Sequence, residues 1–169
     1  DQLEIARVAS SVQVTATGTP HSVDEISKAL DIVNLAEIEG RAEYSVPETI
    51  RTTPGIRVQQ LGGPGALVRI IARGMRPSDT SILIDGYRFR DAASPQGDAS
   101  AFAGDLLTTS VSRIEILRGS GSSLYGTHAT AGVINVITDP GGGSFHGEVG
   151  AEGGGLSIAR GYARFGGSA

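Results

Sequence analysis

The chain has 169 residues, enough for one domain with a hydrophobic core. Its net charge of −4 excludes the basic surface typical of nucleic-acid-binding proteins, and its lack of cysteine excludes disulfides and thiolate catalysis. Its 25 glycines, about twice the usual share, and its few aromatic residues favour short strands and turns over a helical bundle.

The N-terminal part begins with a weakly patterned segment, and we expect residues 1–11 to form a flexible arm. Residues 12–17 alternate apolar and polar side chains, which predicts a half-buried strand that ends at Gly18 and Pro20. Residues 30–35 form a second short apolar run.

The next segment, residues 36–53, carries helical signals. Ser45 is a suitable N-cap, Pro47 falls in the first turn, and Glu48 lies three residues after Ser45, as in a capping box. The helix is expected to end before Pro54.

Strand signals dominate from residue 55 onward. Asp85-Gly86 predicts a tight hairpin turn, and the small polar residues 90–105 predict a loop. The predicted strands cover residues 55–61, 66–74, 80–85, 87–89, 111–119 and 132–139.

The C-terminal part is different in composition, with a boundary near Asp139-Pro140. Two stretches, 145–152 and 156–165, flank three consecutive glycines and predict a β-hairpin. Large and small side chains alternate in the second stretch, with Leu156, Ile158 and Tyr162 between Ser157, Ala159, Gly161 and Ala163. Such a period of two is typical of a transmembrane barrel strand.

The glycine-rich stretch 118–137 raises the possibility of a phosphate-binding loop. Gly121 and Gly126 have P-loop spacing, but Thr127-His128 stand where Lys and Ser/Thr belong. The dinucleotide motif also fails, because Leu124 replaces its third glycine. We therefore interpret these glycines as sites of positive φ and close backbone packing.

No catalytic or metal-binding arrangement is evident in the sequence. The three histidines are far apart, none at the i, i+4 spacing of a helical metal pair. The aspartates of residues 85–105 are spread over turns, where they commonly bond the local backbone. We expect neither an enzyme nor a resident cofactor or metal.

Two arginines, Arg73 and Arg118, each end an apolar strand and precede a glycine. An arginine at a strand end commonly faces water, but its planar guanidinium also suits pairing with carboxylates of another wall. The chain's own acids do not supply obvious partners.

The ordered segments VQVTATGTP, TPGIRV, IARGM, ILIDGYRF and IEILRGSGSSLYGTHATAGVINVITD resemble the plug domain of TonB-dependent outer-membrane receptors. The resemblance covers about residues 12–139. It implies an α+β fold, a small mixed β-sheet with short helices and long loops, enclosed by a 22-stranded barrel that follows it in the chain. We expect residues 12–139 to be this plug and residues 140–169 to be a linker and the first barrel strands.

The resemblance also implies partners and sites. The periplasmic protein TonB would bind an extended TonB box by strand addition. The matching residues are Ser10, Ser11, Val12, Gln13, Val14, Thr15 and Ala16. Arg73-Gly74 and Arg118-Gly119 match positions that anchor the plug to barrel glutamates.

The outward loops of such a plug contact a small-molecule cargo, such as a metal chelate, vitamin or saccharide. The matching residues are Gln60, Gly62, Gly63, Arg76, Ser78, Asp79, Arg88, Arg90 and Asp91. The implied location is the outer membrane, where the plug gates an active transporter and does not contact nucleic acid.

Two other functions stay open from the sequence. The same plug occurs in signal-transducing receptors, which carry an additional N-terminal domain. A free-standing periplasmic binding module is the other alternative, although it would have no need of the C-terminal hairpin.

Overall fold

The computed structural model describes residues 13–14, 21–22, 29–63, 65–121, 125–155 and 159–167. The strands are β1 (Gln13–Val14), β2 (His21–Ser22), β3 (Ala29–Asn34), β4 (Ile56–Gln60), β5 (Val68–Ala72), β6 (Thr80–Ile84), β7 (Tyr87–Arg88), β8 (Val111–Arg118), β9 (Gly132–Thr138), β10 (His146–Gly153) and β11 (Ala159–Gly166). The helices are α2 (Leu35–Gly40), α3 (Val46–Ile50) and the 3-10 turns η2 (Pro77–Asp79), η3 (Ser100–Asp105) and η4 (Thr127–Ala129). None of these described helices has the length and hydrophobicity that crossing a membrane requires.

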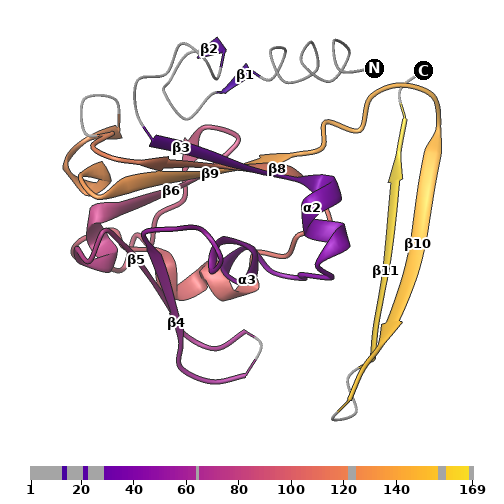
Figure 1. The fold of residues 1–169 in the computed structure, drawn as a ribbon, viewed down its shortest axis with the longest axis horizontal. Helices are drawn as coiled ribbons and strands as arrows, with labels where there is room; N and C mark the ends of the chain where they lie inside the picture. Colours follow the sequence, from indigo (N-terminus) through magenta and orange to yellow (C-terminus); the bar gives the residue numbers. More distant parts are fainter. Residues whose placement is uncertain are drawn as a thin grey trace.

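A mixed five-stranded sheet forms the centre of the molecule, with the strand order β3-β8-β9-β6-β7 (Figure 1). β6 pairs with β9 in parallel, whereas the other pairs are antiparallel. β4 and β5 form a separate antiparallel hairpin. The predicted strands from residue 55 to 139 are confirmed, with ends shifted by one or two residues.

Period-two alternation places apolar side chains on both faces of this sheet. One face packs against α3, β5 and η3, and its core includes Ile50, Ile70, Ile114 and Ile134. The other face carries a smaller cluster that includes Leu83, Leu117 and Val133.

The predicted Asp85-Gly86 turn is confirmed, and it is tied to the end of β9. Both residues have positive φ, 50° and 84°, as a two-residue type I′ hairpin turn requires. The Asp85 carboxylate accepts the Thr138 N–H at 2.8 Å and the Thr138 hydroxyl at 2.7 Å. This turn therefore fixes the point where the chain leaves the sheet.

A buried polar network lies beneath the same turn. Glu115 and Asn135 are both fully buried. Arg113 donates to Glu115 at 3.0 Å, the Asn135 amide donates to Glu115 at 3.4 Å, and the Asn135 carbonyl oxygen accepts the Gly86 N–H at 3.0 Å. These bonds connect β8, β9 and the β6–β7 turn across the sheet.

The helical segment differs in part from its prediction. α3 begins after Ser45, as expected, but the Ser45 side chain forms no capping bond, and Glu48 accepts the Tyr44 N–H instead. The prediction of a capping box is therefore wrong, because Ser45 and Glu48 do not form its two hydrogen bonds. The helical signals predicted over residues 36–53 correspond to two helices, α3 and also α2, where Asn34 is the N-cap and accepts the Glu37 N–H at 3.0 Å. η3, which lies within the predicted loop 90–105, was not predicted.

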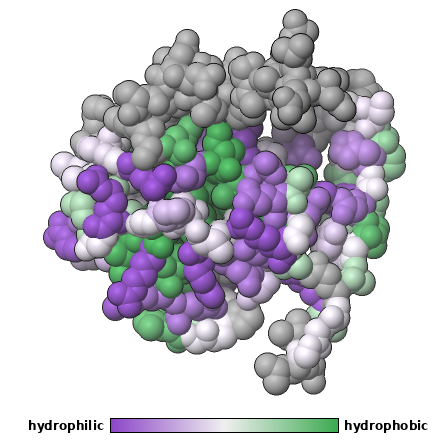
Figure 2. All heavy atoms as spheres, viewed as in Figure 1, coloured by the Kyte–Doolittle hydropathy of each residue, from purple (hydrophilic) through white to green (hydrophobic). Residues whose placement is uncertain are grey.

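β10 and β11 form an antiparallel hairpin that stands beside α2 (Figure 1). Its outward face carries small and apolar residues, among them Val149, Ala163 and Phe165, and Phe165 stacks on Phe145. Figure 2 shows hydrophobic residues on the side of the hairpin turned away from the sheet. The inward face carries Glu148, Arg160, Tyr162 and Arg164.

Candidate functional site

The structure gathers several of the predicted cargo-loop residues at one end of the sheet. Arg76 and Asp79, at the start of η2 and just before β6, form a two-bond ion pair in which both distances are 3.1 Å. The hydrogen bond from Arg76 holds the pKa of the Asp79 carboxyl below its usual range. His128 Nδ1 lies 3.3 Å from the Ser78 carbonyl oxygen, which joins η4 to η2.

A small cavity of about 10 Å³, close to the volume of one water molecule, lies in this group. Its walls include Ser78, Arg88 and Arg90, all predicted as cargo-contacting residues. The buried hydroxyls of Thr80 and Ser81 and the Arg88 Nε have no hydrogen-bond partner within the described part of the chain. Arg88, Arg90 and His128 line this cavity and offer several hydrogen-bond donors. Among the described residues that line it, Asp98 is the only acidic one.

The other predicted cargo residues lie elsewhere. Gln60, Gly62 and Gly63 belong to the tip of the β4–β5 hairpin, where Gln60 bonds the Gly63 carbonyl at 2.7 Å. Asp91 accepts the Ala93 N–H at 2.8 Å and thereby shapes its own loop. None of these residues lines the small cavity.

The two predicted anchoring arginines meet at one turn. The Arg73 N–H donates to the Gly55 carbonyl at 2.8 Å, and the Arg118 guanidinium lies 3.5 Å from the Pro54 carbonyl oxygen. Arg118 also forms an ion pair with Asp31 at 2.5 Å, so the expectation that the chain offers it no carboxylate was wrong. The Arg73 side chain is exposed, and Arg73 and Gly74 both have positive φ.

The predicted TonB box falls largely outside the described residues. Only Gln13 and Val14 belong to the described part, as β1, paired with His21–Ser22 of β2. Ser10, Ser11, Val12, Thr15 and Ala16 lie outside it.

Close packing or positive φ, as predicted, is found at Gly121, Gly126 and Gly132 but not at Gly119. A Cβ at Gly132 would lie 2.7 Å from the Leu117 carbonyl oxygen, and one at Gly121 would lie 2.6 Å from Val133. Gly126 has a φ of 78°. Among the described residues, no group of His, Asp and Glu side chains is arranged to hold a metal ion.

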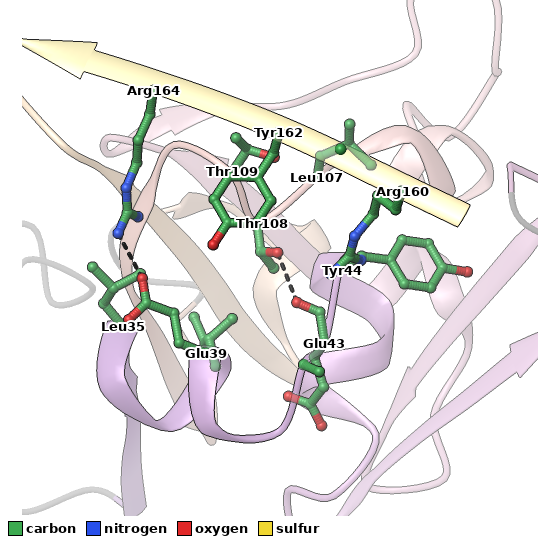
Figure 3. Close-up of a pocket in the computed structure, with 13 residues that line it drawn as sticks. Leu35, Glu39, Glu43, Tyr44, Leu107, Thr108, Thr109, Arg160, Tyr162 and Arg164 are labelled. Atoms are coloured by element: carbon green, nitrogen blue, oxygen red, sulfur yellow. Dashed lines mark hydrogen bonds and ion pairs between the residues drawn. The ribbon is translucent and has the colours of Figure 1, made fainter. Parts of the chain in front are cut away.

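A second, larger cavity was not anticipated from the sequence. It has a volume of about 180 Å³ and lies between α2, the segment 107–109 and β11 (Figure 3). Arg164 reaches across to Glu39 at 2.6 Å, and the Arg160 guanidinium lies 5.2 Å from the centre of the Tyr44 ring. The alternation of Arg with Gly and Ala over residues 159–164 was the available signal.

Comparison with known proteins decides the family. Residues 22–133 match the model of the TonB-dependent receptor plug domain. The chain belongs to this family. Being a plug domain, it is not an enzyme.

Two relatives of this plug are vitamin B12 transporters named BtuB. The protein of Vibrio cholerae is 34% identical over 133 residues, which cover 79% of this chain and 21% of the relative. That of Vibrio vulnificus is 34% identical over 128 residues, which cover 76% and 20%. The chain thus spans about a fifth of the length of the curated relatives it matches.

Solved receptors share the fold of this plug. The ferripyoverdine receptor of the outer membrane of Pseudomonas aeruginosa superposes with a TM-score of 0.74 at 20% identity, covering 92% of this chain and 20% of that one. The alcaligin outer-membrane receptor FauA of Bordetella pertussis gives 0.71 at 22% identity, covering 89% and 25%. The predicted family and its mixed sheet with short helices are therefore confirmed.

Proposed function

We propose that this plug is the gate of an active outer-membrane transporter. It occludes the lumen of a barrel that continues from β11, contributes cargo contacts through its loops, and couples to TonB through residues 10–16. The family match supports the transporter class, and the relatives named as vitamin B12 and siderophore receptors support a small-molecule cargo such as a metal chelate or vitamin.

The observation that carries this proposal is the two-sided hairpin that follows the plug sheet. In an outer-membrane barrel, each strand alternates lipid-facing apolar residues with lumen-facing polar ones. β10 and β11 have this alternation, and their polar face is the one turned toward the plug. We expect the coding sequence after residue 169 to specify further ~10-residue strands with the same period.

The loop cluster supports a role in cargo binding. Arg76, Ser78, Asp79, Arg88 and Arg90 come together at one end of the sheet, although they are dispersed over 15 residues of sequence. The guanidinium groups suit an anionic or hydroxylated cargo, since they offer several donors in fixed geometry. For anchoring to a barrel wall, the exposed Arg73 side chain is one candidate, and Arg118, whose guanidinium lies at Pro54, is the other.

Coupling to TonB is tested by capture on the periplasmic C-terminal domain of TonB. Val12→Pro removes a main-chain donor that strand addition needs, so we expect it to abolish capture. Glu4→Pro, outside the box, is the matched control and should be captured like the parent chain. Equal capture of both variants would refute the assignment of the box.

A further inference from the structure

Arg164 interacts with carboxylates from two different parts of the molecule. Its Nε donates to Glu148 on the neighbouring strand β10 at 2.8 Å. Its terminal nitrogen lies 2.6 Å from Glu39 on α2, across the interface cavity (Figure 3). The Arg164 guanidinium is therefore shared between a carboxylate of the hairpin and a carboxylate of helix α2.

The two carboxylates are held differently. Glu148 lies directly opposite Arg164 in the hairpin register, and its second oxygen accepts the Tyr162 hydroxyl at 2.9 Å. Glu39 lies on a six-residue helix, and its side chain is 46% exposed. If the hairpin separates from α2, Arg164 keeps Glu148 as its partner and Glu39 enters water. Separation therefore leaves no buried, unpaired charge, which is the main cost of breaking a buried ion pair.

A second polar contact crosses the same cavity, whose walls also include the apolar side chains of Leu35, Ile38 and Leu107. The Arg160 guanidinium packs on the Tyr44 ring, a second cation supplied by the hairpin to the plug side. The cavity of about 180 Å³ separates the two surfaces, so close apolar packing does not seal this part of the contact. Ion pairing and cation–π contact contribute to holding the hairpin here, and salt weakens the contribution of exposed charges.

We propose that Glu39 and Arg164 form a reversible latch between the plug and its adjoining hairpin, with Glu148 as the resting partner of Arg164. The latch closes when α2 contacts β11, and its opening leaves no buried, unpaired charge. Its consequence for transport rests on the proposed function: in the complete receptor it is a point where the plug detaches from its wall.

The latch is tested by a distance measurement on the purified chain. The sequence contains no cysteine, so Ala36→Cys on α2 and Ala163→Cys on the outward face of β11 give two unique sites for spin labels. Pulsed electron resonance then reports the distribution of distances between α2 and the hairpin. The parent chain should show a main short distance, with a minor longer one for the open form.

Glu39→Gln should raise the ratio of open to closed molecules about two- to fivefold, the effect expected for a partly exposed ion pair. Sodium chloride at 1 M should raise it in the parent but hardly in this variant. Glu37→Gln removes the same charge from the same helix, where Glu37 pairs with Arg41 rather than with the hairpin. This control should match the parent, and equal shifts in both variants would overturn the latch.

Glu148→Gln tests the role of the resting partner. Without Glu148, Arg164 depends on Glu39 alone, so the open fraction should fall below that of the parent by about two- to fivefold. An increase in the open fraction would refute this role. Equal capture of Val12→Pro and Glu4→Pro by TonB, with an intact latch, would instead count against the proposed function, because Val12 and Glu39 are tested separately.

Discussion

Gly132 is the position at which the close-packing interpretation of the glycine-rich stretch is tested most sharply. Replacing it with alanine places a Cβ 2.7 Å from the Leu117 carbonyl oxygen, where ordinary contact begins near 3.4 Å. The obstacle is the backbone of the neighbouring strand, so a side-chain rotation cannot relieve it. β8 and β9 must move apart by the difference, 3.4 − 2.7 = 0.7 Å, within a fully buried sheet.

Overpacking of this kind costs about 1–3 kcal/mol of unfolding free energy. For a chain of this size, that lowers the melting temperature by about 2–12 °C. Urea unfolding followed by circular dichroism gives the free-energy difference directly.

Gly119→Ala is the matched control for this measurement. Gly119 belongs to the same glycine-rich stretch, lacks a positive φ, and has no atom within 4 Å of the added Cβ. Its unfolding free energy should stay within about 0.5 kcal/mol of the parent. If Gly132→Ala is as stable as Gly119→Ala, the glycines are not needed for close strand packing.

Three further predictions concern the polar contacts. Because Arg76 lowers the pKa of Asp79, the ion pair stabilises the fold fully above the ordinary carboxyl pKa and loses that effect as pH falls below this value and through the lowered pKa of the folded state. The melting temperatures of the parent and Arg76→Gln should therefore differ at pH 7 and converge near pH 2. Asn135→Ala should cost about 2–3 kcal/mol in urea unfolding, because it leaves the Gly86 N–H and Glu115 without this partner; a cost below that of an exposed alanine substitution would contradict the network. Thr138→Val, which removes the hydroxyl bonded to Asp85, should cost about 1 kcal/mol, and wild-type stability would show that this bond does not hold the turn.

Sequence alone predicted the strands well because short runs rich in β-branched apolar residues are typical of strands buried on both faces. Residues 111–118 and 132–138 are such runs and are mostly buried, and the Asp85-Gly86 pair permits positive φ at two consecutive positions. Short helices were harder to predict. α2 has only six residues, too few for a helical period, although Asn34 followed by Glu37 was a usable capping signal.

Contacts between distant segments could not be predicted from sequence. Arg118 meets Asp31 because β3 pairs with β8 in a register that the local pattern does not specify. Likewise, Arg164 faces Glu39 only because the hairpin lies beside α2. The sequence showed which strand positions carry charge, but the packing of whole elements decides which charges meet.

The strand order has a consequence for biogenesis. β9, in the middle of the sheet, comes last of its five strands in the chain, and β8 and β6 pair with its opposite edges. A polypeptide produced from its amino end therefore has no way to complete this sheet until residue 138 is available, and long-range parallel pairing forms slowly even then. We therefore expect the sheet to stay incomplete during synthesis over most of this length, and to form only shortly before β10 and β11 follow.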